Sequence, residues 1–102
     1  MTHDQRRSTR IVVDLPARVR TGTSSFDGRV RNLSAAGMLF LGAALPSPNT
    51  ESDARVEIDL PEGSIALLAE VRWCADGVAG IHFTERPSPL LMNFVMERAL
   101  AD

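Results

Sequence analysis

ARVEIDLPEGSIALLAEVRW, residues 54–73, contains two runs in which apolar and polar side chains alternate. A period of two is typical of a β-strand that buries one face. Pro61, Glu62 and Gly63 stand between the runs and predict a tight turn. The second run places five apolar residues on one face, which is predicted to point inward: Ile65, Leu67, Ala69, Val71 and Trp73. The stretch therefore predicts an antiparallel β-hairpin.

Similar patterns on both sides extend this hairpin into a larger sheet. Residues 11–20 alternate in the same way, with Ile11, Val13, Leu15, Ala17 and Val19 on one face. Pro16 has no N–H for a strand ladder, so we expect an exposed edge or a bulge at that point. The remaining predicted elements are strands at 26–33, 38–41 and 77–83, a loop at 42–53 and a turn at Asp76-Gly77.

The period changes near the end of the chain, where a helix is predicted at about 88–101. Ser88 can cap the helix and Pro89 suits its first turn. The residues that follow in rows typical of an amphipathic helix are Leu90, Leu91, Phe94, Val95, Arg98 and Ala99. Five or six short strands and one terminal helix predict a small, mainly β, antiparallel barrel with the helix packed on it.

Composition limits the class of protein. The chain has 102 residues and an apolar fraction of 44%, which predicts one folded domain. A lone cysteine, Cys74, excludes an internal disulfide, and His3 and His82 belong to no metal-ligand cluster, so no metal is expected. No run reaches the roughly 18 apolar residues of a membrane helix, and the polar start is unlike a secretory signal. We therefore expect a cytoplasmic protein without membrane insertion.

Charge is unevenly distributed along the chain. Residues 1–31 carry seven arginines and three aspartates, whereas residues 32–102 carry four arginines and ten acidic residues. Arg6 and Arg10 are four apart, so they share one face on a strand and are neighbours on a helical turn. Guanidinium groups pair with phosphate oxygens and with the O6/N7 edge of guanine. The segment predicts an arm for an anionic partner, and a solvated basic tail is the alternative.

A second motif, NLSAAGM at 32–38, stands between two predicted strands. Asn32 and Ser34 are two apart, so in strand geometry their polar groups face the same way and can together contact a base edge. Gly37 allows a positive φ or a close backbone approach. The alternative is a hairpin turn whose Asn and Ser bond to their own backbone.

Taken together, Arg6-x-x-x-Arg10 and Asn32-x-Ser34-x-x-Gly37 resemble the two motifs of the PilZ domain, a bacterial receptor for the second messenger cyclic di-GMP. The resemblance extends to the GIHF segment at 80–83 and to the terminal helix. It implies a six-stranded antiparallel β-barrel over residues 11–102 and a flexible arginine-rich arm over residues 1–10.

The resemblance also implies roles for individual residues. Arg6 and Arg10 would bind phosphates and guanine edges of cyclic di-GMP, Asn32 and Ser34 would hold a guanine edge, and Gly37 would let the backbone come close. Arg7 would either add a ligand contact or be solvated. Trp73 would either stack on a base of the ligand or belong to the core. The ordered arm would change the surface offered to a downstream protein. Typical outputs of the family are motility, biofilm formation and exopolysaccharide synthesis.

Three other readings compete with a receptor. A nucleic-acid-binding barrel would use the same arm, but the acidic second half and the few aromatic residues argue against it. A PilZ-like adaptor would bind only proteins, although such members usually lack the two motifs. Catalysis is not expected, because no nucleophile-elbow glycines flank Ser34. The sequence leaves open the partner, the oligomeric state and the choice between one and two bound dinucleotides.

Overall fold

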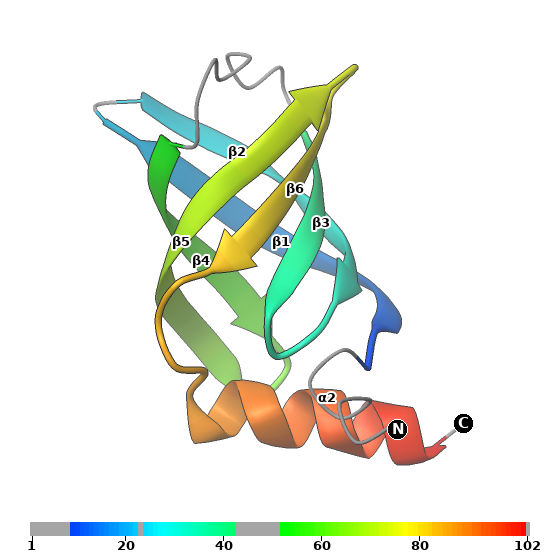
Figure 1. Cartoon of the computed structure of the whole chain (residues 1–102). Coiled ribbons are helices and arrows are strands. Elements are labelled where there is room, and N and C mark those ends of the chain that lie inside the picture. The colour runs from blue at the N-terminus through cyan, green and yellow to red at the C-terminus, as the bar shows by residue number, and fades with distance from the viewer. Residues whose placement is uncertain (1–8, 23, 43–51, 102) are drawn as a thin grey trace, which may run out of the picture.

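The computed structural model describes residues 9–22, 24–42 and 52–101, and these form an antiparallel barrel with one helix at its end (Figure 1). The strands are β1 (Ile11–Thr21), β2 (Ser24–Leu33), β3 (Gly37–Gly42), β4 (Ser52–Leu60), β5 (Gly63–Ala75) and β6 (Val78–Phe83). The helix is α2 (Pro89–Ala101). The prediction of a mainly β fold with a C-terminal helix is confirmed.

The six strands close on themselves in the order β1-β2-β3-β6-β5-β4, and every neighbouring pair is antiparallel. The seam between β1 and β4 is short, because only Ala17–Arg20 of β1 pairs with β4. Closure leaves few strand edges exposed to pairing with other chains. The two hairpins predicted around residues 61–63 and 76–77 are both present, as β4–β5 and β5–β6.

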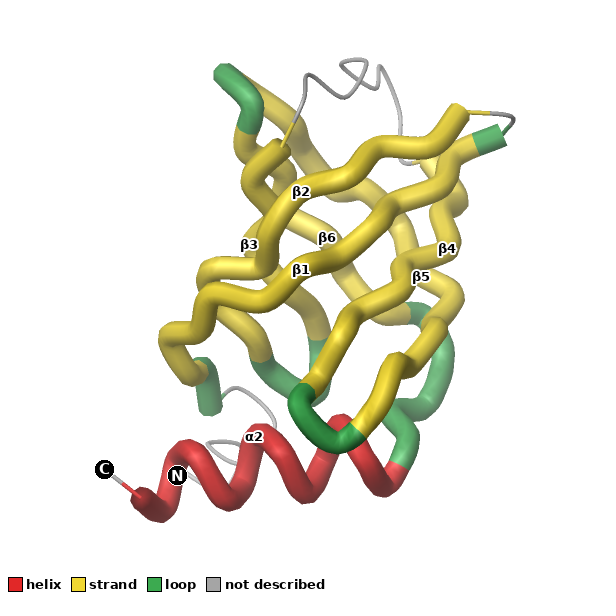
Figure 2. Tube along the Cα trace, turned by 180° about the vertical axis from the view of Figure 1, so that it is seen from behind, coloured by secondary structure: helices red, strands yellow, loops and turns green. Residues whose placement is uncertain are grey.

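Alternation along the strands fills the barrel with apolar side chains, and α2 closes one end of it. Figures 1 and 2 show the helix lying across the open end of the barrel. Its residues Leu91, Phe94 and Val95 are buried in the same core as the strand residues. The hydroxyl of Ser88 accepts a hydrogen bond from the Leu91 N–H, at 3.3 Å between Oγ and N, so the predicted N-cap is confirmed. None of the described helices is long and apolar enough to cross a membrane.

Element boundaries differ from the prediction by a few residues. β3 ends at Gly42 and β4 begins at Ser52, both inside the segment predicted as a loop, and residues 43–51 of that loop lie outside the described residues. Asp76 and Gly77 both have positive φ angles, 52° and 78°, as a two-residue hairpin turn of type I′ requires. Pro16 pairs in register with Arg29 of β2 and precedes the first residue paired with β4, so it lies at an edge of β1, which is one of the two expected alternatives. The bulge lies earlier, between Val12 and Leu15.

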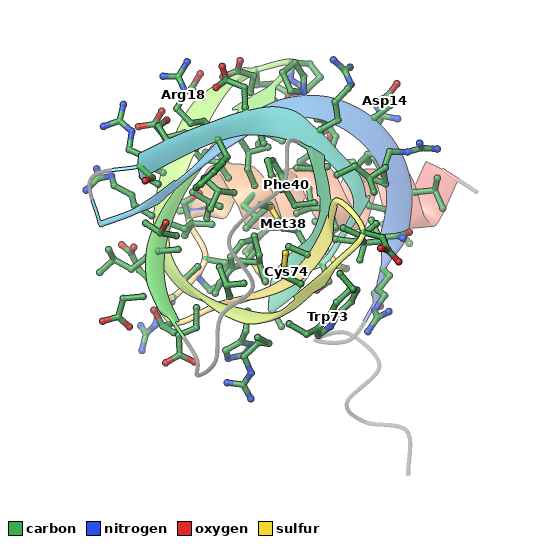
Figure 3. All side chains as sticks on the ribbon, turned by 90° about the horizontal axis from the view of Figure 1, so that it is seen from above. Asp14, Arg18, Met38, Phe40, Trp73 and Cys74 are labelled. Carbon is green, nitrogen blue, oxygen red and sulfur yellow. The ribbon has the colours of Figure 1, made fainter. Side chains whose placement is uncertain are left out.

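Bulges break the alternation at three places. The register shifts between Val12 and Leu15 in β1, and at Arg31 in β2 and Arg72 in β5, each of which is an extra residue in its ladder. The β5 bulge makes one prediction wrong, since Trp73 does not share the inward face with Val71. Trp73 is instead 49% exposed, and Figure 3 shows it outside the barrel wall while Cys74 points inward.

Candidate functional site

A hollow of about 320 Å³ lies on the outer wall of the barrel, over the adjoining strands β2, β3, β6 and β5. The start of β1 and the β2–β3 turn, which border it, lie at the end of the barrel that faces α2 (Figure 1). Its lining comprises Arg10, Asn32, Leu33, Ser34, Ala36, Gly37, Met38, Leu39, Arg72, Trp73, Gly80, Ile81 and His82. Segments far apart in the sequence therefore meet in one surface feature.

Two bulges supply outward-facing groups to this hollow. In β2 the extra residue Arg31 turns Asn32 away from the interior, while Leu33 resumes the inward face and is fully buried. In β5 the extra residue Arg72 has the same effect on Trp73. The Asn32 amide makes no hydrogen bond to any other described residue. Bulges that redirect side chains are frequent beside binding sites, and here they present an amide and an indole to the same space.

Trp73 lies over Gly80, its partner across the β5–β6 ladder. A Cβ atom built on Gly80 would fall 2.2 Å from Nε1 and 2.5 Å from Cε2 of the indole. The absence of a side chain at Gly80 therefore lets the ring lie against the strand. One side of the indole packs on the barrel wall, and the half-exposed remainder is available for stacking.

Strand geometry predicted that Ser34 and Asn32 face the same way, and this prediction is wrong. β2 ends at Leu33, and Ser34 is buried within the β2–β3 turn. Its Oγ accepts hydrogen bonds from the N–H groups of Ala36 at 3.1 Å and Gly37 at 3.2 Å, and it donates to the Gly37 carbonyl at 3.3 Å. The serine thus holds its own turn together, as the alternative predicted for it, whereas the Asn32 side chain makes no such bond to another described residue.

Gly37 permits a close backbone approach rather than a positive φ. It pairs with His82 of β6, and a Cβ atom at Gly37 would lie 2.3 Å from the carbonyl oxygen of Ile81. The described glycines with positive φ are Gly22, Gly63 and Gly77. A side chain at Gly37 would therefore force β3 and β6 apart where both border the hollow.

The lining is electropositive. Its charged or titratable side chains are Arg10, Arg72 and His82, and no carboxylate belongs to the described lining. Arg72 also forms an ion pair with Glu70, at 3.0 Å between Nη1 and Oε1. Arg10 is exposed and has no ion-pair partner among the residues the structure describes. A hollow of this character suits an anionic, planar ligand.

Most other arginines of the barrel wall are paired with carboxylates. Arg29 donates hydrogen bonds to the side chain and the backbone carbonyl of Asp14, and the side-chain bond holds the pKa of that carboxyl below its ordinary value. Arg18 donates to Asp27 at 2.8 Å, and this hydrogen bond raises the pKa of the guanidinium. Figure 3 shows Asp14 and Arg18 on the outside of the barrel, and neither lines the hollow.

The structure brings together five of the residues singled out from the sequence: Arg10, Asn32, Ser34, Gly37 and Trp73. Arg6 and Arg7 lie outside the described residues, as does the rest of the predicted arm apart from Thr9 and Arg10. Sequence reasoning missed Arg72, Gly80 and His82 as members of the lining. The GIHF segment, which includes Gly80 and His82, was a signal that could have found two of them.

Comparisons with known proteins agree with this geometry. The model of the PilZ domain family matches residues 4–96. The PilZ domain of CeSA from a cellulose-synthesising bacterium superposes with a TM-score of 0.70 at 17% identity, covering 90% of this chain and 95% of that one. An uncharacterised Legionella protein gives a TM-score of 0.56 at 16% identity, with coverages of 90% and 94%.

A further structural match is the Bacillus subtilis inhibitor of motility, MotI/DgrA, with a TM-score of 0.76 at 21% identity. The match covers 91% of this chain and only 50% of that protein. No curated protein matches this chain in sequence. PilZ domains are binding and regulatory domains known as receptors for cyclic di-GMP. Since the family model spans most of the chain and the barrel has the family's architecture, this chain belongs to the PilZ domain family.

Proposed function

We propose that this protein is a cyclic di-GMP receptor that binds the dinucleotide in the hollow on the outer barrel wall. The observation that carries the proposal is the convergence of Arg10, Asn32 and Trp73 on that hollow, from the start of β1, the end of β2 and the β5 bulge. Cyclic di-GMP carries two phosphates and two guanines, so a receptor needs cationic donors, a base-edge partner and an aromatic or apolar face.

Each of these groups has a counterpart in the site. Arg10, which has no ion-pair partner among the described residues, would bind a phosphate or a guanine O6/N7 edge, together with Arg6 and with further support from Arg7. Asn32 would pair with a guanine edge through its unengaged amide. The half-exposed indole of Trp73 would stack on a base. Ser34 and Gly37 would contribute through the turn that they shape.

The size of the hollow supports a ligand that the barrel encloses only in part. Its volume of about 320 Å³ is at the lower end of the range for ligand pockets. A dinucleotide would leave one side uncovered, where the arm of residues 1–10 would close over it. Charge-assisted hydrogen bonds contribute about 1.5–3 kcal/mol each, enough for several of them to order such a segment.

Ligand binding would act as a switch rather than as a step of catalysis. In this scheme the ordered arm presents a new surface to a downstream protein in the cytoplasm. Motility, biofilm formation and exopolysaccharide synthesis are the outputs to examine, and the structural likeness to an inhibitor of motility makes motility the first of them.

Isothermal titration calorimetry with cyclic di-GMP tests the proposal directly, with GMP and GTP as control ligands. Saturable binding of the cyclic dinucleotide alone is expected, and the stoichiometry separates one bound molecule from a stacked pair. Because binding with little heat would escape calorimetry, ligand-induced shifts in an NMR spectrum serve as a second probe. If neither heat nor NMR shifts were observed, the receptor proposal would be overturned in favour of a ligand-independent adaptor.

A further inference from the structure

His82 of β6 borders the hollow. It lies across the β3–β6 ladder from Gly37, the last residue of the Asn32-to-Gly37 turn. Its backbone pairs with Gly37 on one side and with Glu70 on the other. The side chain is exposed and points away from the core, between the buried residues Ile81 and Phe83. It makes no hydrogen bond to another residue that the structure describes. Neither the fold nor the core therefore requires an imidazole at this position.

The described charged groups that border His82 are one ion pair and one further arginine. On β5 the charged neighbours are Glu70 and Arg72, which form an ion pair with each other. The charged residue of the lining at the start of β1 is Arg10. The facing part of β3, residues 37–39, carries no charged side chain. The carboxylate closest in register to His82 is that of Glu70, which is engaged by Arg72, and an anion in the hollow would supply a further counter-charge to a protonated imidazole.

We infer that His82 is an additional ligand-binding residue, which donates a hydrogen bond to an anionic oxygen of the bound dinucleotide and makes its affinity depend on pH. The inference rests on the proposed function and adds to it a residue that the two motifs do not include. Histidine side chains change charge between about pH 5 and pH 8. The phosphodiester groups of the ligand stay ionised throughout this interval, so the protein side of the contact is the part that titrates.

The direction of the effect follows from linkage. A ligand that binds the protonated imidazole more tightly than the neutral one must in turn favour protonation of that imidazole. Affinity is then greatest at low pH and falls as the pH rises. For one partly exposed charge-assisted contact, we expect binding to be about three- to tenfold tighter at pH 5.5 than at pH 8.

The experiment is a set of cyclic di-GMP titrations at about pH 5.5, 7 and 8 on the wild type and on His82→Gln, covering the interval in which histidine titrates. Glutamine keeps a donor and an acceptor but has no proton to gain. His3→Gln is the companion variant: His3 is the other histidine of the chain and belongs to the proposed arm, so this variant separates any contribution of the arm to the pH dependence from that of His82. NMR observation of the His82 ring with and without ligand gives a second readout that a merely structural role would not change.

The expected result is a pH-dependent affinity in the wild type and in His3→Gln, and an affinity nearly independent of pH in His82→Gln. The NMR signals of the His82 ring should also change when the ligand binds. Wild-type binding that does not vary with pH, or a pH dependence retained in His82→Gln, would overturn this inference and leave the receptor proposal standing. Absence of binding at every pH would overturn both.

Discussion

The indole of Trp73 occupies the space that a side chain on Gly80 would fill. The two residues are partners across the β5–β6 ladder, and the indole Nε1 would lie 2.2 Å from a Cβ atom on Gly80. Since the other parts of the ring are exposed, Trp73 can swing outward if that space is taken. This pair therefore links a backbone position in one strand to the orientation of an aromatic group in the proposed ligand site.

Gly80→Ala should displace Trp73 without unfolding the barrel. We expect the tryptophan emission to move to longer wavelength and the free energy of unfolding to fall by about 1 kcal/mol, as for loss of a cross-strand pair. Loss of a positioned stacking face should weaken cyclic di-GMP binding by about tenfold. The same substitution in a Trp73→Ala background is the control and should have almost no further effect on affinity. Equal effects in both backgrounds would contradict the proposed coupling.

Ser34→Ala should destabilise the protein, because the buried Ser34 hydroxyl is the acceptor for the Ala36 and Gly37 N–H groups in a partly buried turn. A hydrogen bond of this kind contributes about 0.5–1.5 kcal/mol, so loss of the two bonds should lower the free energy of unfolding in urea by about 1–2 kcal/mol. Ser64→Ala is the matched control: that hydroxyl donates to Asp59 at 2.7 Å on the exposed surface. Its loss should change stability by less than about 0.5 kcal/mol. Equal stabilities of the two variants would show that the turn does not depend on Ser34.

Arg10→Ala should weaken cyclic di-GMP binding by about one to two decades while leaving thermal stability unchanged, because Arg10 is exposed and is not used in an ion pair with any described residue. Arg6→Ala is expected to act in the same direction. Arg55→Ala serves as the control, since Arg55 is an exposed arginine on β4, across the barrel from β3. A similar loss of affinity in Arg55→Ala would indicate a general effect of charge and would contradict a specific clamp.

The ion pair of Asp14 and Arg29 should stabilise the barrel at neutral pH and not in acid. The hydrogen bond from Arg29 lowers the pKa of Asp14 in the folded state from its ordinary value of 3.8. A lowered folded-state pKa gives stability that is present above 3.8 and is lost as the pH falls through the folded value. Asp14→Asn should therefore lower the urea midpoint at about pH 7 and have little effect at about pH 2.

The Arg29→Gln background provides the control for this pair. Without Arg29, the substitution of Asp14 should have a smaller effect at neutral pH, where Arg31 remains the nearby positive charge. The pair is exposed, so the expected shifts are small and best measured as differences between matched variants. An effect of Asp14→Asn that is equally large in acid would show that the carboxylate charge is not its cause.

Local patterns were sufficient to predict the architecture. Alternation, short apolar runs and turn residues together identified the strands, and the Ser88 cap identified the start of the helix, because burial and capping act over a few neighbouring residues. Both motif segments were also found from their residue types. Arg10 and the Asn32-to-Gly37 turn border one hollow, as the resemblance to PilZ domains had implied.

Orientation at the site depends on register, which the sequence does not display. A period of two assigns Trp73 to the interior, yet one extra residue, Arg72, reverses the assignment. Ser34 was expected to face the ligand with Asn32, but the strand ends between them and the hydroxyl bonds to backbone N–H groups instead. These outcomes are decided by pairing with other strands and by the demands of the turn, so they need the folded structure.

The incomplete pairing of β1 has a consequence for how the barrel opens. Within the described residues, β4 joins β1 only along Ala17–Arg20, whereas residues 11–16 are held by the interrupted ladder with β2. Local unfolding begins where backbone hydrogen bonds are fewest. Amide exchange should therefore be faster in residues 11–16 of β1 than in Ala17–Arg20, which pair with β4. The strand segment that leads to Arg10 can thus fluctuate while the rest of the barrel stays closed, and protection of its amides would report occupancy of the site.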